Sequence, residues 1–414
     1  MKTTIKFIML MAIIAIATTS CKKTIYADEI IITPDNVLLQ VGKTITLTAE
    51  FVPSNTTDQN IFWLSSNENI ATIDAKTGVL TGISGGTAII TASTGSAFVN
   101  KTITVTWFSS GDGSAGNPYI INTPAELDAV RANLSAHYKL GANIDLSDYL
   151  ASGGAGFAKW GENGWAPIGN NNDQFKGSLD GAGFKISGIW INRPSQSLIG
   201  LFGCIYNTTI KNLGVEIAND KGGIKGNDFV GGLAGSSLRT EVGITKCYVI
   251  GDVSGKNNVG GMIGSGGKIT NCYTTGNVSG NDYVGGISGD GANMTSSYSA
   301  CVVNGSTSVG GMAGMGSATN CVALNPLVKA ANGLCGRIEG FNAGTFINCW
   351  GSNTMMVIWI NNIKTLNKGG NKNDGADCAE MPSASWWTTA APNGPGWSAT
   401  DWIFTNGQLP KLRY

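Results

Sequence analysis

Apolar residues return in short alternating runs through the first third of the chain. Between residues 30 and 107 these runs include "TITLTAEF", "IFWLS" and "TAIITAS", and they are separated by Gly, Asn, Asp and Pro. A period of two places the apolar side chains on one face of a strand, and several short strands at this spacing are typical of a β-sandwich. We therefore predict a β-sandwich over residues 30–107.

A pattern with a longer period fills the second half of the chain. The segments "VGGLAG", "VGGMIG", "VGGISG" and "VGGMAG" start at residues 230, 259, 284 and 309, and a parallel series reads "ITKC", "ITNC", "MTSS" and "ATNC". Each repeat then supplies about three short strands that cannot bury their apolar side alone, whereas repeats stacked about 4.8 Å apart share a core. The repeats predict an all-β chain with a single-stranded parallel β-helix over residues 119–414.

One amphipathic helix is predicted between these regions, at residues 123–135. Thr123 is placed as the N-cap, Pro124 takes the first helical position, and Glu126 completes a capping box. The apolar face of this helix holds Leu127, Val130 and Leu134. An open end of a strand stack needs a cover, so we expect this N-terminal helix to cap the solenoid. The Gly/Ser-rich residues 108–118 predict a flexible linker.

The N-terminus has the pattern of an export signal. Basic residues precede a short apolar run, which predicts a signal peptide over residues 1–20. Thr19 and Ser20 before Cys21 resemble a lipobox, and this resemblance implies that Cys21 is acylated and anchors the protein to a membrane. An ordinary signal peptide with an unmodified cysteine is the alternative. Residues 21–29 would form the tether, and we expect a monomer at the outer membrane or cell surface.

The two regions resemble known families. "LLQVGKTITLTAEFVP" and "GVLTGISGGTAIITAS" resemble the group 2 bacterial Ig-like domain, in which Trp63 would be the core aromatic residue. Such modules serve as spacers or as adhesive units. The glycine-bounded strings, such as "GGLAG", resemble proteins with GLUG repeats, a family of bacterial surface proteins that includes adhesins. Related repeats occur beside the metalloprotease domain of immunoglobulin A proteases, but this sequence has no such zinc motif.

The composition of the chain excludes several classes of function. Lys plus Arg and Asp plus Glu number 27 each, so no basic field favours nucleic acid as a partner. The sequence has one histidine, His137, and an HExxH zinc site needs two, so this kind of site is excluded. Arg193, Arg239 and Arg337 are scattered, and no predicted column brings Asp, Lys and Arg together. We therefore predict no catalytic residues, no metal and no cofactor.

Two outward features are candidate ligand sites. The turns before the VGG segments place Asp228, Asn257 and Asp282 in one column with Thr307. This column could bind a small cation or a polar saccharide, or its residues could simply form Asx turns. The second feature is a cluster of four tryptophans near the C-terminus, which could stack on sugars or close the solenoid as a buried cap. The cluster consists of Trp386, Trp387, Trp397 and Trp402.

A third column is predicted to point inward and to form a structural ladder. Its mixture of Cys, Leu and Ser favours small buried side chains, and parallel in-register side chains are poorly placed for disulfides. We expect free buried thiols. The ladder consists of Leu213, Cys247, Cys272, Ser297, Cys321 and Cys349.

These observations together favour a function in binding over one in catalysis. We expect a non-enzymatic surface or periplasmic lipoprotein for adhesion, or for binding a host or matrix glycan or protein ligand. The alternative is a β-helix polysaccharide lyase or glycoside hydrolase, since a fold alone does not decide function.

Overall fold

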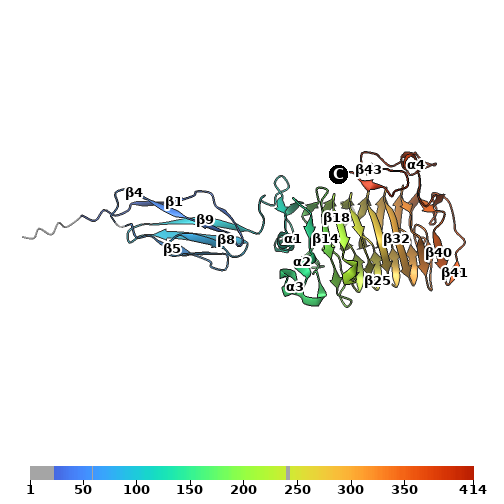
Figure 1. Cartoon of the computed structure of the whole chain (residues 1–414), viewed down its shortest axis with the longest axis horizontal. Coiled ribbons are helices and arrows are strands. Elements are labelled where there is room, and N and C mark those ends of the chain that lie inside the picture. The colour runs from blue at the N-terminus through green and yellow to red at the C-terminus, as the bar shows by residue number, and fades with distance from the viewer. Residues whose placement is uncertain (1–22, 58, 239–242) are drawn as a thin grey trace, which may run out of the picture. The chain divides into compact units, whose positions relative to one another are not determined.

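The computed structural model describes residues 23–57, 59–238 and 243–414. The chain divides into two compact units, Met1–Trp107 and Phe108–Tyr414 (Figure 1). The predicted signal peptide, Cys21 and Arg239 lie outside the described residues. Among the described residues, no helix has both the length and the apolar character needed to cross a membrane.

The first unit is the predicted β-sandwich. A four-stranded sheet in the order β2-β9-β8-β5 packs with a three-stranded sheet, β3-β7-β6, and with the antiparallel pair β1-β4. Trp63, Leu80 and Ile103 are buried in the core between them. The strands are β1 (Glu29–Thr33), β2 (Leu38–Gln40), β3 (Thr44–Thr46), β4 (Thr48–Val52), β5 (Phe62–Ser65), β6 (Ala71–Ile73), β7 (Val79–Gly82), β8 (Gly86–Ser93) and β9 (Phe98–Thr106).

The sandwich begins earlier than the sequence pattern indicates. The amide of Thr57 donates to the carbonyl of Ile25, and the amide of Asp28 donates to the carbonyl of Val52. Ala27 is buried. Residues 25–29, which we predicted as part of a tether, therefore belong to the folded domain, because their backbone groups are paired with it.

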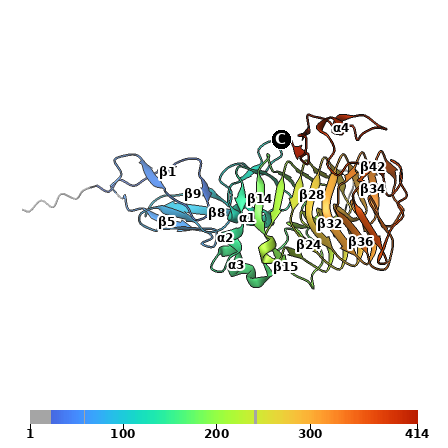
Figure 2. The same cartoon turned by 45° about the vertical axis from the view of Figure 1, so that its right-hand side comes forward.

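The second unit is a parallel β-solenoid. The strands of its described part pair in parallel from coil to coil. The exceptions among these strands are the antiparallel hairpin of β40 (Met356–Trp359) and β41 (Asn362–Ile363) and the antiparallel pair of β43 (Trp402–Ile403) and β44 (Lys411–Leu412). Figure 2 shows the strands stacked side by side along the solenoid. Apolar residues such as Val230, Val259 and Val284 fill its interior. The all-β prediction with a parallel solenoid is confirmed.

Each regular coil contributes to four sheets, one more than we predicted. The nine-strand sheet holds β10 (Tyr119–Ile121), β11 (His137–Leu140), β13 (Ser178–Asp180), β17 (Thr209–Lys211), β22 (Gly243–Thr245), β27 (Lys268–Thr270), β31 (Ala292–Thr295), β34 (Gly316–Thr319) and β38 (Phe346–Ile347). The fifteen-strand sheet holds β40, β41, β12 (Ile144–Asp145), β14 (Lys185–Ile189), β15 (Ile191–Asn192), β18 (Gly214–Ile217), β19 (Ile224–Lys225), β23 (Tyr248–Ile250), β24 (Val253–Ser254), β28 (Tyr273–Ser279), β32 (Tyr298–Gly305), β35 (Val322–Ala323), β36 (Leu327–Ala330), β39 (Trp350–Ser352) and β42 (Ala376–Cys378).

The VGG-x-x-G segment explains the fourth sheet, because it forms two strands joined by a corner. A Cβ atom on Gly260 would lie 2.6 Å from the carbonyl oxygen of Ile287, so only glycine fits there. The first half of the segment belongs to the five-strand sheet of β20 (Asp228–Gly231), β25 (Asn257–Gly260), β29 (Asp282–Gly285), β33 (Thr307–Gly310) and β37 (Cys335–Gly336). The second half belongs to the solenoid's four-strand sheet of β16 (Phe202–Ile205), β21 (Ala234–Ser237), β26 (Ile263–Ser265) and β30 (Ser288–Asp290).

Helix α1 (Pro124–Ala129) lies at the N-terminal end of the solenoid (Figure 1). Its capping box is formed as predicted, but the helix ends early and continues as one 3-10 turn over Val130–Ala132. Leu127 and Val130 are buried, whereas Leu134 lies beyond the turn and is half-buried. Two of the three predicted apolar residues, Leu127 and Val130, are therefore fully buried at this end of the solenoid.

The predicted linker at 108–118 is part of the folded solenoid. Phe108 is buried and stacks on Tyr119, with their ring centroids 4.4 Å apart. The amides of Asp112 and Gly113 donate to the carbonyl of Asn117. A composition rich in glycine and serine thus forms tight turns here instead of a flexible connection.

The C-terminal segment runs back along one flank of the solenoid. Residues 384–412 carry α4 (Ala384–Thr388), β43 and β44, which Figure 1 shows beside the coils and not across their end. Trp397 Nε1 donates to the carbonyl of Asn320 at 2.6 Å, and Lys246 forms an ion pair with Asp401 at 2.9 Å. The tryptophan-rich segment is therefore a side cover, where we predicted an end cap.

Candidate functional site

The predicted outward column exists and is one residue wide. Asp228 lies beside Asn257, Asn257 beside Asp282, and Asp282 beside Thr307 on neighbouring parallel strands. The Asn257 amide donates to Asp228 at 2.9 Å, and the Thr307 hydroxyl donates to Asp282. These residues begin strands, and their side chains bond along the column between coils instead of forming the Asx turns that were the alternative.

This column holds the coils together more clearly than it offers a ligand site. Both carboxylates already accept hydrogen bonds from neighbours in the column, and Asn227 Nδ2 gives Asp228 another at 3.0 Å. Asn257 Oδ1 is buried and has no hydrogen-bond partner among the described residues. A free ligand would have to displace bonds that already link successive coils.

The tryptophan cluster is mostly buried. Trp387, Trp397 and Trp402 pack on Tyr298, and only Trp386 is partly exposed. Tyr298 belongs to a stack of three tyrosines. The ring centroids of Tyr298 and Tyr273 are 4.9 Å apart, and those of Tyr273 and Tyr248 are 5.1 Å apart. The predicted ligand candidate Trp387 therefore has no face free for a sugar, and Trp386 offers only part of one.

The inward ladder is buried at every position, and its cysteines are free thiols. Burial raises the pKa of the Cys349 thiol to about 11, which keeps it protonated near neutral pH. The residue before each ladder position has a positive φ, a conformation that asparagine tolerates better than most residues. These preceding residues are Asn212, Lys246, Asn271, Ser296, Asn320 and Asn348.

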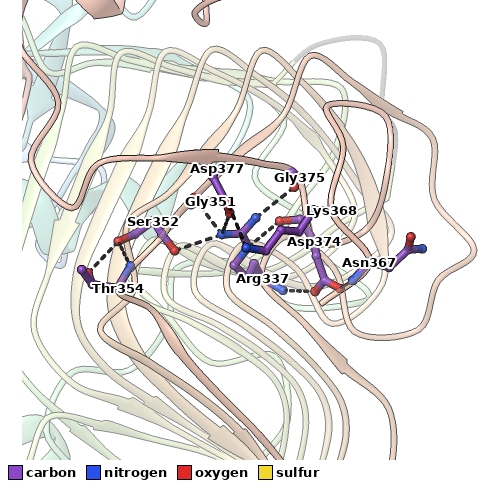
Figure 3. A network of polar contacts seen from close by, with 9 residues as sticks. All are labelled: Arg337, Gly351, Ser352, Thr354, Asn367, Lys368, Asp374, Gly375 and Asp377. Carbon is purple, nitrogen blue, oxygen red and sulfur yellow. Dashed lines mark hydrogen bonds and ion pairs between the residues drawn. The ribbon is translucent and has the colours of Figure 1, made fainter. Parts of the chain in front are cut away.

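The prediction that no arginine meets acidic residues is wrong for Arg337, which contacts Asp374 and Asp377. Its fully buried guanidinium contacts the last coils (Figure 3). Asp374 is also buried and accepts from the Arg337 amide at 2.9 Å. Every guanidinium nitrogen donates to protein, so the group ties the coils together and has no nitrogen left for a substrate. Its acceptors are the carbonyls of Gly351, Ser352, Asp374 and Gly375 and the carboxylate of Asp377.

His137 is engaged by a neighbouring coil. Its Nδ1 lies 2.8 Å from the Ser178 hydroxyl, and the two residues face each other on the parallel strands β11 and β13. Among the described residues, no group of three or more His, Cys, Asp or Glu side chains is placed to hold a metal ion.

The feature most suited to a ligand is a cleft that the sequence analysis missed. It has a volume of about 420 Å³ and lies between the helical insertion after β12 and the neighbouring coils. The insertion consists of α2 (Ser147–Leu150) and α3 (Ala155–Trp160). Its lining residues are Ser147, Leu150, Ala151, Ser152, Phe157, Glu162, Gly188, Trp190, Asn192, Ala218, Asp220, Lys221 and Lys225.

A glycine bulge lets the insertion approach the sheet. Gly188 has φ +72°, and the pairing of β14 with β18 shifts register at this residue. A Cβ atom there would lie 2.5 Å from the Ser147 hydroxyl oxygen at the start of α2. The bulge thus removes one side chain from the sheet where the helix packs, which sets the floor of the cleft.

Two half-buried aromatic residues, Trp190 and Phe157, form part of the cleft wall. The Trp190 ring packs against the backbone of Gly164, where a Cβ atom would lie 2.5 Å from ring atom Cε3. The amide of Trp165 donates to the carbonyl of Trp190 at 2.9 Å. Trp190 is therefore held in place by the neighbouring backbone, and as a half-buried residue it contributes to the lining of the cleft.

The rim of the cleft carries exposed charges of both signs. Glu162 comes from the insertion, whereas Asp220, Lys221 and Lys225 come from the next coil of the solenoid. An aromatic wall with a few polar groups at the rim is the usual composition of a small-molecule site. The cleft joins an insertion to a coil, so no repeat column in the sequence could have located it.

The insertion is anchored by a buried carboxylate. Asp128 in α1 pairs with Arg131 and Lys159 and accepts from the Tyr149 hydroxyl at 3.1 Å. Burial alone would raise the pKa of Asp128, but the hydrogen bonds and charges of Arg131 and Lys159 outweigh it and lower the pKa. Arg131 also lies over the rings of Trp160 and Trp165. Arg131 also lines a second cavity, which has a volume of about 620 Å³.

Comparison with known proteins identifies the first unit and the fold of the second. Residues 27–111 match the bacterial Ig-like domain (group 2). A crystal structure of a "putative immunoglobulin A1 protease" from Bacteroides ovatus superposes with a TM-score of 0.58 and covers 74% of this chain and 95% of that one. Its sequence is 19% identical, so this likeness shows the fold alone.

The curated relatives match parts of the chain. A "Putative Gly-rich membrane protein" from Evansella cellulosilytica is 34% identical over 189 residues, which is 38% of this chain and 21% of that protein. Halomucin from Haloquadratum walsbyi is 32% identical over 266 residues, which is 55% of this chain and 3% of halomucin. A 3-O-alpha-D-galactosyl-alpha-L-arabinofuranosidase from Bifidobacterium longum is 43% identical over 54 residues, 13% of this chain and 5% of that enzyme. The matched part of the chain thus spans about a fifth or less of each relative.

Proposed function

We propose that this protein is an exported surface lipoprotein that binds a glycan in the cleft at Trp190 and performs no reaction on it. The observation that carries the proposal is the half-buried Trp190, which lines the cleft together with Phe157 and with charged side chains. Aromatic faces combine a large apolar surface with little conformational freedom, which suits the apolar faces of sugar rings. The charges on the rim can then hydrogen-bond the hydroxyl or carboxylate groups of the sugar.

The surroundings of the cleft support a binding function at a surface. Bacterial Ig-like domains accompany extracellular proteins, and one relative carries the name of a membrane protein. GLUG-type repeats and an acylated Cys21 remain part of the proposal. The other candidate sites are less suitable, because the Asp228 column is internally bonded and Trp387 is buried.

A glycan-binding screen with the mature protein tests the proposal. We expect binding to at least one class of mucin, matrix or plant glycan, and Trp190→Ala should weaken it at least tenfold because the stacking surface is lost. The matched control is Trp359→Ala, since Trp359 is also partly exposed but lies in β40 near the other end of the solenoid. Equal losses in both variants, or binding of protein ligands only, would contradict the proposal.

Glycan cleavage is the second candidate, and the same cleft favours it. Glu162 and Asp220 both line the cleft, and most glycosidases use two carboxylates that flank the scissile bond. One partial relative is named as a glycosidase.

A reducing-end assay, together with an absorbance assay for unsaturated lyase products, separates the two candidates. Under the binding proposal, the parent protein releases no product. Release of product that stops in both Glu162→Gln and Asp220→Asn would instead establish the enzyme.

A further inference from the structure

Several large apolar side chains are exposed at one end of the Ig-like domain. Phe98 is 72% exposed, Tyr26 59%, Phe62 58% and Val52 42%. The domain exposes other apolar side chains as well, but these four lie at the same end, and an exposed apolar patch marks an interaction site more often than single exposed residues do. We call Tyr26, Val52, Phe62 and Phe98 the tip patch.

The strand pairing brings these residues together. Phe62 at the start of β5 pairs with Ser93, and Ser93 pairs with Phe98 at the start of β9. Residues opposite each other share a face of the sheet, so both phenylalanines project on the same side, about 10 Å apart across two strand spacings. They form one half of the tip patch.

The other half is joined to it through the turn between β8 and β9. Ser96 in this turn donates to the carbonyl of Ala27 at 3.3 Å, and the amide of Asp28 donates to the carbonyl of Val52 at 2.7 Å. Tyr26 directly precedes Ala27. The first residues of the folded domain therefore lie at the same end as Phe62 and Phe98.

The described part of the chain begins at residue 23, three residues before Tyr26 of the tip patch. Cys21 precedes Tyr26 by five residues, which span at most about 17 Å when fully extended. An acyl chain on Cys21 would therefore hold the tip patch within reach of the bilayer surface. Aromatic side chains are favoured at the boundary between headgroups and acyl chains.

We propose that the tip patch is a second membrane contact, in which Tyr26, Val52, Phe62 and Phe98 enter the headgroup region of the bilayer. The contact holds the Ig-like domain against the membrane surface. The proposal rests on the proposed anchor at Cys21 for its location. In the sequence, Lys22 and Lys23 balance the charges of Asp28 and Glu29, so the proposed contact is apolar and needs no anionic lipid.

Vesicle flotation of the mature chain with Cys21→Ser tests this contact without the lipid anchor. We expect binding to phosphatidylcholine vesicles, and the double variant Phe62→Ser with Phe98→Ser should weaken it at least tenfold. The control is Leu38→Ser with Ile83→Ser, because these residues are 59% and 45% exposed but lie near the other end of the sandwich. The control should bind within twofold of the parent.

Two results would overturn the proposal: no binding of the parent to these vesicles, or an equal loss in the control. Melting curves show whether the variants remain folded, and the substituted side chains are exposed, so little change is expected. Fatty-acid labelling of the unaltered protein in cells reports on Cys21 separately. Labelling without vesicle binding refutes only the tip contact, whereas vesicle binding without labelling refutes only the anchor.

Discussion

The regular middle coils and the N-terminal coils of the solenoid share the same parallel strand pairing, but they differ in what they form. In the middle coils, Val230, Val259 and Val284 occupy one inward column, and glycines occupy the corners. In the N-terminal coils, the insertion between β12 and β13 interrupts the stack and creates the cleft at Trp190. Equivalent coils present equivalent surfaces, so the repeats form a framework in which no coil differs from its neighbours. A specific site arises where the repeat is interrupted.

The largest expected effect follows from filling a corner in the regular coils. Gly260→Val should destabilise the protein by more than about 4 kcal/mol, since its Cβ atom would lie 2.6 Å from the Ile287 carbonyl oxygen and backbone cannot move aside. Chemical denaturation measures this loss. Gly116→Ala is the control, because a Cβ atom there meets nothing within 4 Å. A fully stable Gly260→Val would show that the corners are not tightly packed.

A smaller loss is expected at the anchor of the irregular coils. Asp128→Asn should cost about 3 kcal/mol at pH 7, because it leaves Arg131 and Lys159 without their buried partner. The pKa of Asp128 is lowered by folding, so its stabilisation is complete above the ordinary value of 3.8 and is lost as the pH falls through the lowered value. The gap between parent and variant in unfolding experiments should therefore shrink below about pH 4. A constant gap down to pH 2 would contradict the ion-pair explanation.

The smallest expected effect concerns the outward column of the regular coils. Asn257→Ala removes the hydrogen bond to Asp228 and should cost about 1 kcal/mol. Glycan binding should not change, because the column is part of the framework. The same binding assay that is used for Trp190→Ala checks this expectation. A loss of binding in Asn257→Ala with unchanged stability would return the column to the candidate sites.

Local patterns predicted the elements well. The capping box at Thr123 and Glu126 formed because it needs only a few adjacent residues. The column of Asp228, Asn257 and Asp282 was located because repeats place equivalent residues side by side. The number of sheets was missed because "VGGLAG" reads as one strand, although its glycines allow a sharp corner inside it.

Interactions distant in sequence were not predictable in the same way. Arg337 meets Asp374 and Asp377 about 40 residues later, at the irregular end of the stack, where no repeat aligns them. The tryptophan segment was expected over the end of the solenoid, but its rings pack on the flank, against the stack of Tyr248, Tyr273 and Tyr298.

The sequence by itself determined the two folds, because a period of two and a repeat of about 25 residues each leave one way to bury the apolar side chains. Only the tertiary structure decided where a ligand could be held. The cleft needs the bulge at Gly188, the ring of Trp190 and the charges of Glu162 and Lys221 to meet across different coils. That meeting depends on how the insertion packs against the stack, and the packing of distant segments leaves no periodic signal in the chain.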